Sequence, residues 1–160
     1  MTTHEGWQEL TLELFRRVRA ELAEVLAEDD PARVAAGGNS VGWLVWHVLR
    51  GQDRNLSEVA GTPQLWVSGW AERFGRPADP ADTGYGHTRA EAGAFAAARD
   101  QLAGYAEAVQ AMIEQYLAGA PEGDLRRVAA SSTLGTADTV AERLAGQLQD
   151  SFMHLGQIRG

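Results

Sequence analysis

Four long segments of the chain repeat apolar residues every three or four positions, the period of an α-helix that buries one face. They span residues 6–28, 40–60, 88–118 and 139–158. The first ends where Asp-Asp-Pro follows, and the third ends at a glycine with a proline two residues later. The pattern predicts an all-α chain, and we interpret residues 1–160 as a single four-helix bundle domain.

Short polar motifs mark where these helices begin. The sequences Thr-Arg-Ala-Glu at residues 88–91 and Thr-Val-Ala-Glu at residues 139–142 are capping boxes. In such a box, the threonine accepts a hydrogen bond from the backbone and the glutamate reaches back to the first N–H group. Asn39 or Ser40 is a suitable N-cap for the second helix. That helix starts with the apolar run 41–49, which predicts that its first half is buried.

One connection, residues 61–87, is much longer than the others. Thr62 and Pro63 resemble an N-cap followed by proline at the first helical position. Aromatic residues then recur at steps of four, at Trp66, Trp70 and Phe74. We therefore predict a short aromatic helix on the bundle, followed by a Pro-, Asp- and Gly-rich loop over residues 76–86. Connections of this length are uncommon unless they cross the domain or carry function.

Three side chains predict a metal site. Asp150 and His154 are four residues apart on the fourth helix, so their side chains point the same way. With His47 from the apolar start of the second helix, they form a ligand set of two histidines and one carboxylate. Three protein ligands leave one coordination position open, as in catalytic zinc sites. The alternative is a local Asp–His pair and a buried core histidine that donates to a carbonyl.

The position of these residues along their helices favours one bundle topology. His47 lies roughly 11 Å from the start of its helix, and Asp150 and His154 lie near the end of theirs. In an up-down-up-down bundle the ligands would miss one another by on the order of 10 Å. If the second and third helices run parallel, the ligands come level. We therefore predict an up-down-down-up bundle in which residues 61–87 are the crossover between helices two and three and carry the short extra helix.

Composition narrows the possible functions. The chain has no cysteine, which excludes disulfides, cysteine nucleophiles and cysteine-ligated metals. All 14 basic residues are arginine, so Schiff-base chemistry on lysine is excluded. A net charge of −8 disfavours nucleic acid as a partner.

No basic leader is visible at residues 1–5 and no apolar run approaches the roughly 20 residues of a membrane span, so we expect a cytoplasmic protein without membrane contact. His4, at the opposite end of the bundle from the predicted site, receives no role.

Several stretches resemble a known family. Residues 39–53, Asn-Ser-Val-Gly-Trp-Leu-Val-Trp-His-Val-Leu-Arg-Gly-Gln-Asp, are similar to the second-helix motif of DinB-like proteins. Residues 150–160, with Asp-x-x-x-His-x-Gly-Gln, resemble the closing helix of that family. Residues 69–75 and 82–88 resemble the crossover of the branch grouped with mycothiol-dependent maleylpyruvate isomerase. Together these stretches extend the resemblance over nearly the whole chain.

The resemblance implies a fold, a cofactor and a partner. DinB-like proteins have an up-down-down-up bundle, typically bind a divalent metal through three side chains and commonly form homodimers. His47 and His154 match the two ligand histidines, and Asp150 stands where many relatives have histidine and the isomerase branch has glutamate. The expected metal is zinc, with nickel, iron and manganese as the alternatives that such a donor set suits. The expected cosubstrate is a low-molecular-weight thiol of the mycothiol type.

A mechanism follows from the open coordination position. A coordinated thiol loses its proton and becomes a nucleophile toward an electrophilic small molecule. Because the chain has no cysteine, this thiol must come from a cosubstrate. We therefore expect a metal-dependent thiol S-transferase or isomerase. Two alternatives stay open: a non-catalytic bundle that binds a small ligand or partner around a structural or vestigial metal, and a metal-dependent hydrolase with water at the open position.

Four further residues are candidates for the surroundings of the metal. Arg50 can hold a carboxylate of the thiol or substrate, or form an ordinary surface pair. Asp53 is turned by about 120° from His47, so it is interpreted as an ion-pair partner or as a group that orients a ligand. Tyr85 and His87 can orient substrate or supply a proton, with packing of the loop as the alternative.

Overall fold

The computed structural model of the chain describes residues 6–160. Residues 1–5 lie outside this range, so the expectation that no leader is present and the position of His4 fall outside the described residues. Among the residues described, no helix is both long and apolar enough to cross a membrane.

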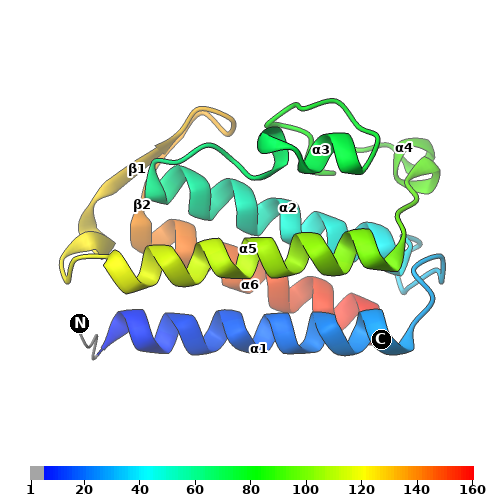
Figure 1. Cartoon of the computed structure of the whole chain (residues 1–160), viewed down its shortest axis with the longest axis horizontal. Coiled ribbons are helices and arrows are strands. Elements are labelled where there is room, and N and C mark those ends of the chain that lie inside the picture. Colours follow the sequence, from blue (N-terminus) through cyan, green and yellow to red (C-terminus); the bar gives the residue numbers. More distant parts are fainter. Residues whose placement is uncertain (1–5) are drawn as a thin grey trace.

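Four long helices make up most of the molecule. They are α1 (Trp7–Glu28), α2 (Val41–Ala60), α5 (Arg99–Gly119) and α6 (Val140–Arg159). In Figure 1 they lie side by side, with α2 and α5 running in one direction and α1 and α6 in the other. Both α1 and α2 pack against α5 and α6. The prediction of a mostly helical protein is confirmed.

The core lies between these helices. Each helix contributes fully buried apolar side chains, among them Phe15, Trp46, Leu102 and Ile158. The burial of one apolar side chain of this size contributes roughly 1.5–3 kcal/mol to the stability of the fold. The apolar run that opens α2 is almost continuously buried, as its sequence predicted.

The predicted helix starts are found where the caps indicated them. The Ser40 hydroxyl accepts a hydrogen bond of 3.1 Å from the N–H of Trp43 and caps α2. The boxes opened by Thr88 and Thr139 both form in full. A side chain that satisfies an unpaired N–H group at a helix start contributes about 1 kcal/mol.

The third predicted helix is wrong in one respect, because it is not continuous. A short helix, α4 (Arg89–Ala94), is followed by a break, and α5 begins only at Arg99. At the break the backbone of Phe95 is extended, and its ring stacks on Trp46 with 4.7 Å between centroids. A single glycine, Gly93, precedes the break, and no proline marks it. A tertiary contact overrides the local preference for helix, which is a weak determinant.

The crossover between α2 and α5 contains two short elements, the 3-10 turn η1 (Trp66–Ser68) and α3 (Trp70–Arg73). A short extra helix was expected, but its start at Thr62 is wrong. The Asp53 carboxylate, reaching from α2, instead accepts hydrogen bonds of 2.9 and 2.8 Å from the N–H groups of Leu65 and Trp66. A distant side chain therefore determines where the turn begins.

The structure also contains a β-hairpin that the all-α prediction did not include. After the 3-10 turn η2 (Asp124–Arg126), the strands β1 (Val128–Ser131) and β2 (Thr136–Thr139) pair antiparallel. The hairpin is tied to α2 because the Ser131 hydroxyl donates to the Glu58 carboxylate at 2.8 Å. Strands of four residues are too short to show a clear alternation in the sequence.

Candidate metal centre

The structure brings His47, Asp150 and His154 together between α2 and α6. Possible ligand atoms of the three side chains all lie within 4.8 Å of one another. His47 comes from α2, and the other two come from α6, four residues apart. The two imidazole rings meet edge to face, with 4.7 Å between their centroids. Among residues 6–160, no other group of three such side chains converges in this way.

The orientation of His47 is fixed by the crossover. Its Nδ1 lies 2.5 Å from the carbonyl oxygen of Thr83. A carbonyl oxygen can only accept, so Nδ1 carries the proton and Nε2 keeps its lone pair free for a metal. The close approach requires glycine at the next position. Gly84 has a φ of +87°, and a Cβ there would lie 2.8 Å from Trp43 and 3.1 Å from Nδ1 of His47.

The orientation of His154 is fixed within its own helix. Its Nδ1 lies 2.7 Å from Oε1 of Gln157, which accepts the N–H. Its Nε2 lies 3.2 Å from the Asp150 carboxylate. Both histidines thus donate from Nδ1 to an oxygen outside the cluster, which leaves Nε2 as the nitrogen available to a metal. This is the arrangement that orients histidine ligands in metal sites.

The electrostatics of the three side chains suit a cation. Burial lowers the pKa of His47, which is therefore neutral near pH 7. The hydrogen bond that His154 donates to the Asp150 carboxylate raises the pKa of His154. Burial acts to raise the pKa of Asp150, but its hydrogen bond to His154 and the nearby positive charges outweigh burial and lower it. The cluster therefore offers a carboxylate and two imidazole nitrogens, and a metal at His154 competes with the proton that Asp150 favours there.

This donor set fits a divalent metal. Two nitrogens and one oxygen suit zinc, iron, nickel or manganese rather than a harder ion. All three side chains are half-buried, so solvent and a small molecule can reach the remaining coordination position.

A cleft adjoins the cluster on the side of the hairpin. Its volume is about 270 Å³, and it is lined by His47, Arg54, Tyr85, Asp150 and residues of the hairpin and α6. Such a volume holds a small molecule rather than a macromolecule. Tyr85, with 84% of its surface exposed, stands at the rim, where a bound molecule can contact it.

His87 is placed for packing. Its Nδ1 accepts a hydrogen bond of 3.3 Å from the indole N–H of Trp43, and its ring stacks on Trp46. Its Nε2 lies 3.6 Å from a carboxylate oxygen of Asp82. Both ring nitrogens of His87 therefore face protein groups.

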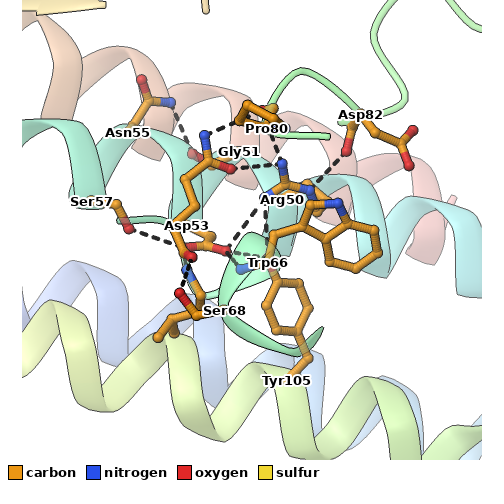
Figure 2. A network of polar contacts seen from close by, with 12 residues as sticks. Arg50, Gly51, Asp53, Asn55, Ser57, Trp66, Ser68, Pro80, Asp82 and Tyr105 are labelled. Atoms are coloured by element: carbon orange, nitrogen blue, oxygen red, sulfur yellow. Dashed lines mark hydrogen bonds and ion pairs between the residues drawn. The ribbon is translucent and has the colours of Figure 1, made fainter. Parts of the chain in front are cut away.

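Arg50 and Asp53 lie in a buried network, shown in Figure 2, rather than in the cleft. Both side chains are fully buried and form an ion pair of 3.4 Å. Asp53 also accepts a 2.6 Å hydrogen bond from the Tyr105 hydroxyl. The Arg50 guanidinium also donates to Tyr105 in α5 and to three acceptors in the crossover, on Gln64, Pro80 and Asp82. Arg50 thus neither faces a ligand nor lies on the surface, and Asp53 is its ion-pair partner.

Three residues that contribute to the site were absent from the sequence-based set. Gln157 lies in the closing-helix motif, so its position three residues after His154 was a usable signal. Arg54 follows His47 by seven residues, two turns along the same helix face, which also could have been used. Thr83 acts through its backbone carbonyl, for which the side chain gives no signal.

Comparison with known proteins agrees with this architecture. A crystal structure titled as a conserved protein of locus from Enterococcus faecalis superposes with a TM-score of 0.82 and 29% sequence identity. The match covers 98% of this chain and 95% of that one. No curated protein matches the chain. Residues 11–158 match the model of the DinB superfamily, and the chain therefore belongs to that superfamily.

Proposed function

We propose that the protein is a metal-dependent enzyme that activates a low-molecular-weight thiol for S-transfer or isomerisation. One observation carries the proposal: ligand atoms of His47, Asp150 and His154 converge within 4.8 Å of one another, while Nδ1 of each histidine is hydrogen-bonded to an oxygen outside the cluster. A core histidine and a local Asp–His pair would not need to converge in this way.

Each residue of the centre has a defined task. His47 and His154 bind through Nε2, and Asp150 supplies a negative charge that favours the bound cation. Thr83 and Gln157 keep the rings from rotating. The cleft beside the cluster admits a small molecule next to the open position.

When bound, the divalent metal would lower the pKa of a thiol so that the thiolate is present near neutral pH. The protein has no cysteine to take this position, so the sulfur comes from a free thiol. The resemblance of residues 69–75 and 82–88 to the crossover of the mycothiol branch supports a thiol of this type. Asp150 in place of glutamate shortens the carboxylate arm by one methylene and is a reason to compare zinc with nickel, iron and manganese.

The first test is metal content. We expect about one divalent ion per chain in the native protein and a loss of at least tenfold in the His47→Ala and His154→Ala variants. His87→Asn is the matched control, because it removes an imidazole outside the cluster. Equal metal content in all four proteins would refute the ligand assignment.

The second test is thiol chemistry. The metal-loaded protein is incubated with mycothiol and monochlorobimane, and displacement of chloride by the thiol is followed by fluorescence. We expect turnover that His154→Ala lacks and His87→Asn keeps. No turnover with the metal fully loaded would refute thiol transfer to this class of electrophile.

A further inference from the structure

Arg54 is an arginine in the cleft whose role the proposed metal chemistry does not use. It follows His47 by seven residues on α2, so the two side chains share one helix face about 10 Å apart along the axis. Helical side chains lean toward the N-terminus, which brings the guanidinium toward His47. Arg54, His47 and Asp150 line the same cleft.

The guanidinium of Arg54 forms no hydrogen bond and no close ion pair with the part of the chain that is described. Its Nε is buried and makes no hydrogen bond. Glu58, one turn further along α2, is the natural partner, but its carboxylate is already taken. It receives Arg143 at 2.6 Å, the Ser131 hydroxyl at 2.8 Å and the Thr133 hydroxyl at 3.3 Å.

The other buried arginines of the region differ sharply from Arg54. Arg143 donates to Asn55, to the carbonyl of Ala129 and to Glu58. The guanidinium of Arg50 likewise has hydrogen-bond acceptors in the protein, in the network shown in Figure 2. The buried Nε–H of Arg54 lacks a hydrogen bond, and an anion in the cleft would supply one.

Charged groups of both signs surround this position. Burial and the nearby charges of Arg50 and Arg143 lower the pKa of Arg54, whereas Glu58 and Asp150 oppose this shift. Asp138 and Glu142 also line the cleft and repel large polyanions. One small carboxylate therefore suits the site better than a phosphate-rich molecule.

We propose that Arg54 is the specificity residue of the cleft and binds one carboxylate of the small molecule that reaches the metal centre. The inference rests on the proposed function, because the metal position defines the other end of that molecule. A guanidinium matches a carboxylate with two parallel hydrogen bonds, which fixes orientation as well as charge.

The test compares two thiols of equal length, 3-mercaptopropionate and the neutral 3-mercapto-1-propanol. Both are titrated into protein loaded with Co²⁺, whose sulfur-to-metal charge-transfer absorption reports binding without turnover. We expect the native protein to prefer the acid by about tenfold, the size of one charge-assisted contact. The preference disappears in Arg54→Gln, is intermediate in Arg54→Lys and persists in Arg19→Gln, which removes an exposed arginine elsewhere.

Two results would overturn the assignment: equal affinity of the native protein for both thiols, or a preference that survives in Arg54→Gln. If Arg54→Gln does not fold, as judged by its circular dichroism, the same comparison is made with Arg54→Lys, and an unchanged preference there overturns the assignment.

A further measurement distinguishes a failure of this inference from a failure of the proposed function. If Co²⁺ does not load, or neither thiol changes the spectrum, thiol activation is refuted. Arg54 is then judged by succinate, which carries no sulfur. A rise in melting temperature with succinate in the native protein but not in Arg54→Gln supports the carboxylate site, and equal responses overturn it.

Discussion

The imidazole Nδ1 of His47 and the carbonyl oxygen of Thr83 lie 2.5 Å apart, although 36 residues separate them in the chain. This contact joins the crossover to the candidate metal centre. The crossover thus has a task beyond connecting α2 to the next helix, because its backbone selects the tautomer that leaves Nε2 of His47 free.

The contact depends on Gly84, so Gly84→Ala is predicted to weaken metal binding. The added Cβ would meet Trp43 and His47 at 2.8 and 3.1 Å, and φ at this position is +87°. We expect a loss of about 10- to 100-fold in metal affinity, together with about 1–3 kcal/mol of stability. Metal affinity is measured by competition with a chromophoric chelator, and stability by urea unfolding.

Gly86→Ala is the matched control for this prediction. Gly86 has a similar φ of +80°, but a Cβ there meets nothing within 4 Å. It carries the backbone strain without the contact to His47. If Gly86→Ala weakens metal binding as much as Gly84→Ala does, backbone strain alone explains the effect and the role of the Thr83 carbonyl is refuted.

The second prediction concerns Gln157, whose amide oxygen holds Nδ1 of His154 at 2.7 Å. Removing it in Gln157→Ala frees the ring to rotate, and we expect metal affinity to fall about tenfold. Gln157 is exposed, so stability should change by less than about 0.5 kcal/mol. Gln149→Ala, at an exposed position of the same helix, serves as control. An unchanged affinity in Gln157→Ala would show that Asp150 alone orients His154.

The comparison of sequence and structure shows which features are encoded locally. Thr139 and Ser40 cap their helices where the sequence indicated, because a cap depends on residues within one turn. The break at Phe95 was missed because its cause is a contact with Trp46, almost fifty positions earlier in the chain. Local sequence patterns predict helices well, but they do not predict helix breaks that are caused by contacts between distant residues.

The same distinction applies to the candidate site. Asp150 and His154 could be paired from their spacing alone, since four residues bring two side chains to one helix face. Arg50 could not be assigned in this way, because its partners lie in the crossover and in α5. The spacing of seven residues places Arg54 on the same helix face as His47, but its missing hydrogen bond is visible only in the structure, where Glu58 is occupied by Arg143.

The buried pair of Arg50 and Asp53 leads to a third prediction. Arg50→Met leaves the Asp53 carboxylate buried without its cation, and we expect a loss of about 3–5 kcal/mol in the free energy of unfolding. Arg16→Met breaks the exposed pair with Glu114 and should cost less than about 1 kcal/mol. Both are measured by urea unfolding. Metal content per folded chain should be unchanged in Arg50→Met. A stable Arg50→Met that binds substrate more weakly would instead place Arg50 in ligand recognition.

Metal addition provides the last prediction, because the ligands lie on two helices and come together only in the folded chain. An ion that binds the folded state alone stabilises it by about 2.7 kcal/mol when its free concentration is 100 times the dissociation constant. For a chain of this size we expect the melting temperature to rise by about 5–10 °C with Zn²⁺ and to return to its initial value with a chelator. His154→Ala should show no rise, and His87→Asn should show the full rise. Since histidines in an unfolded chain also bind zinc weakly, the comparison between these two variants is the decisive quantity. Equal shifts in both would mean that the ion binds elsewhere, and the assignment of His47, Asp150 and His154 as ligands would be abandoned.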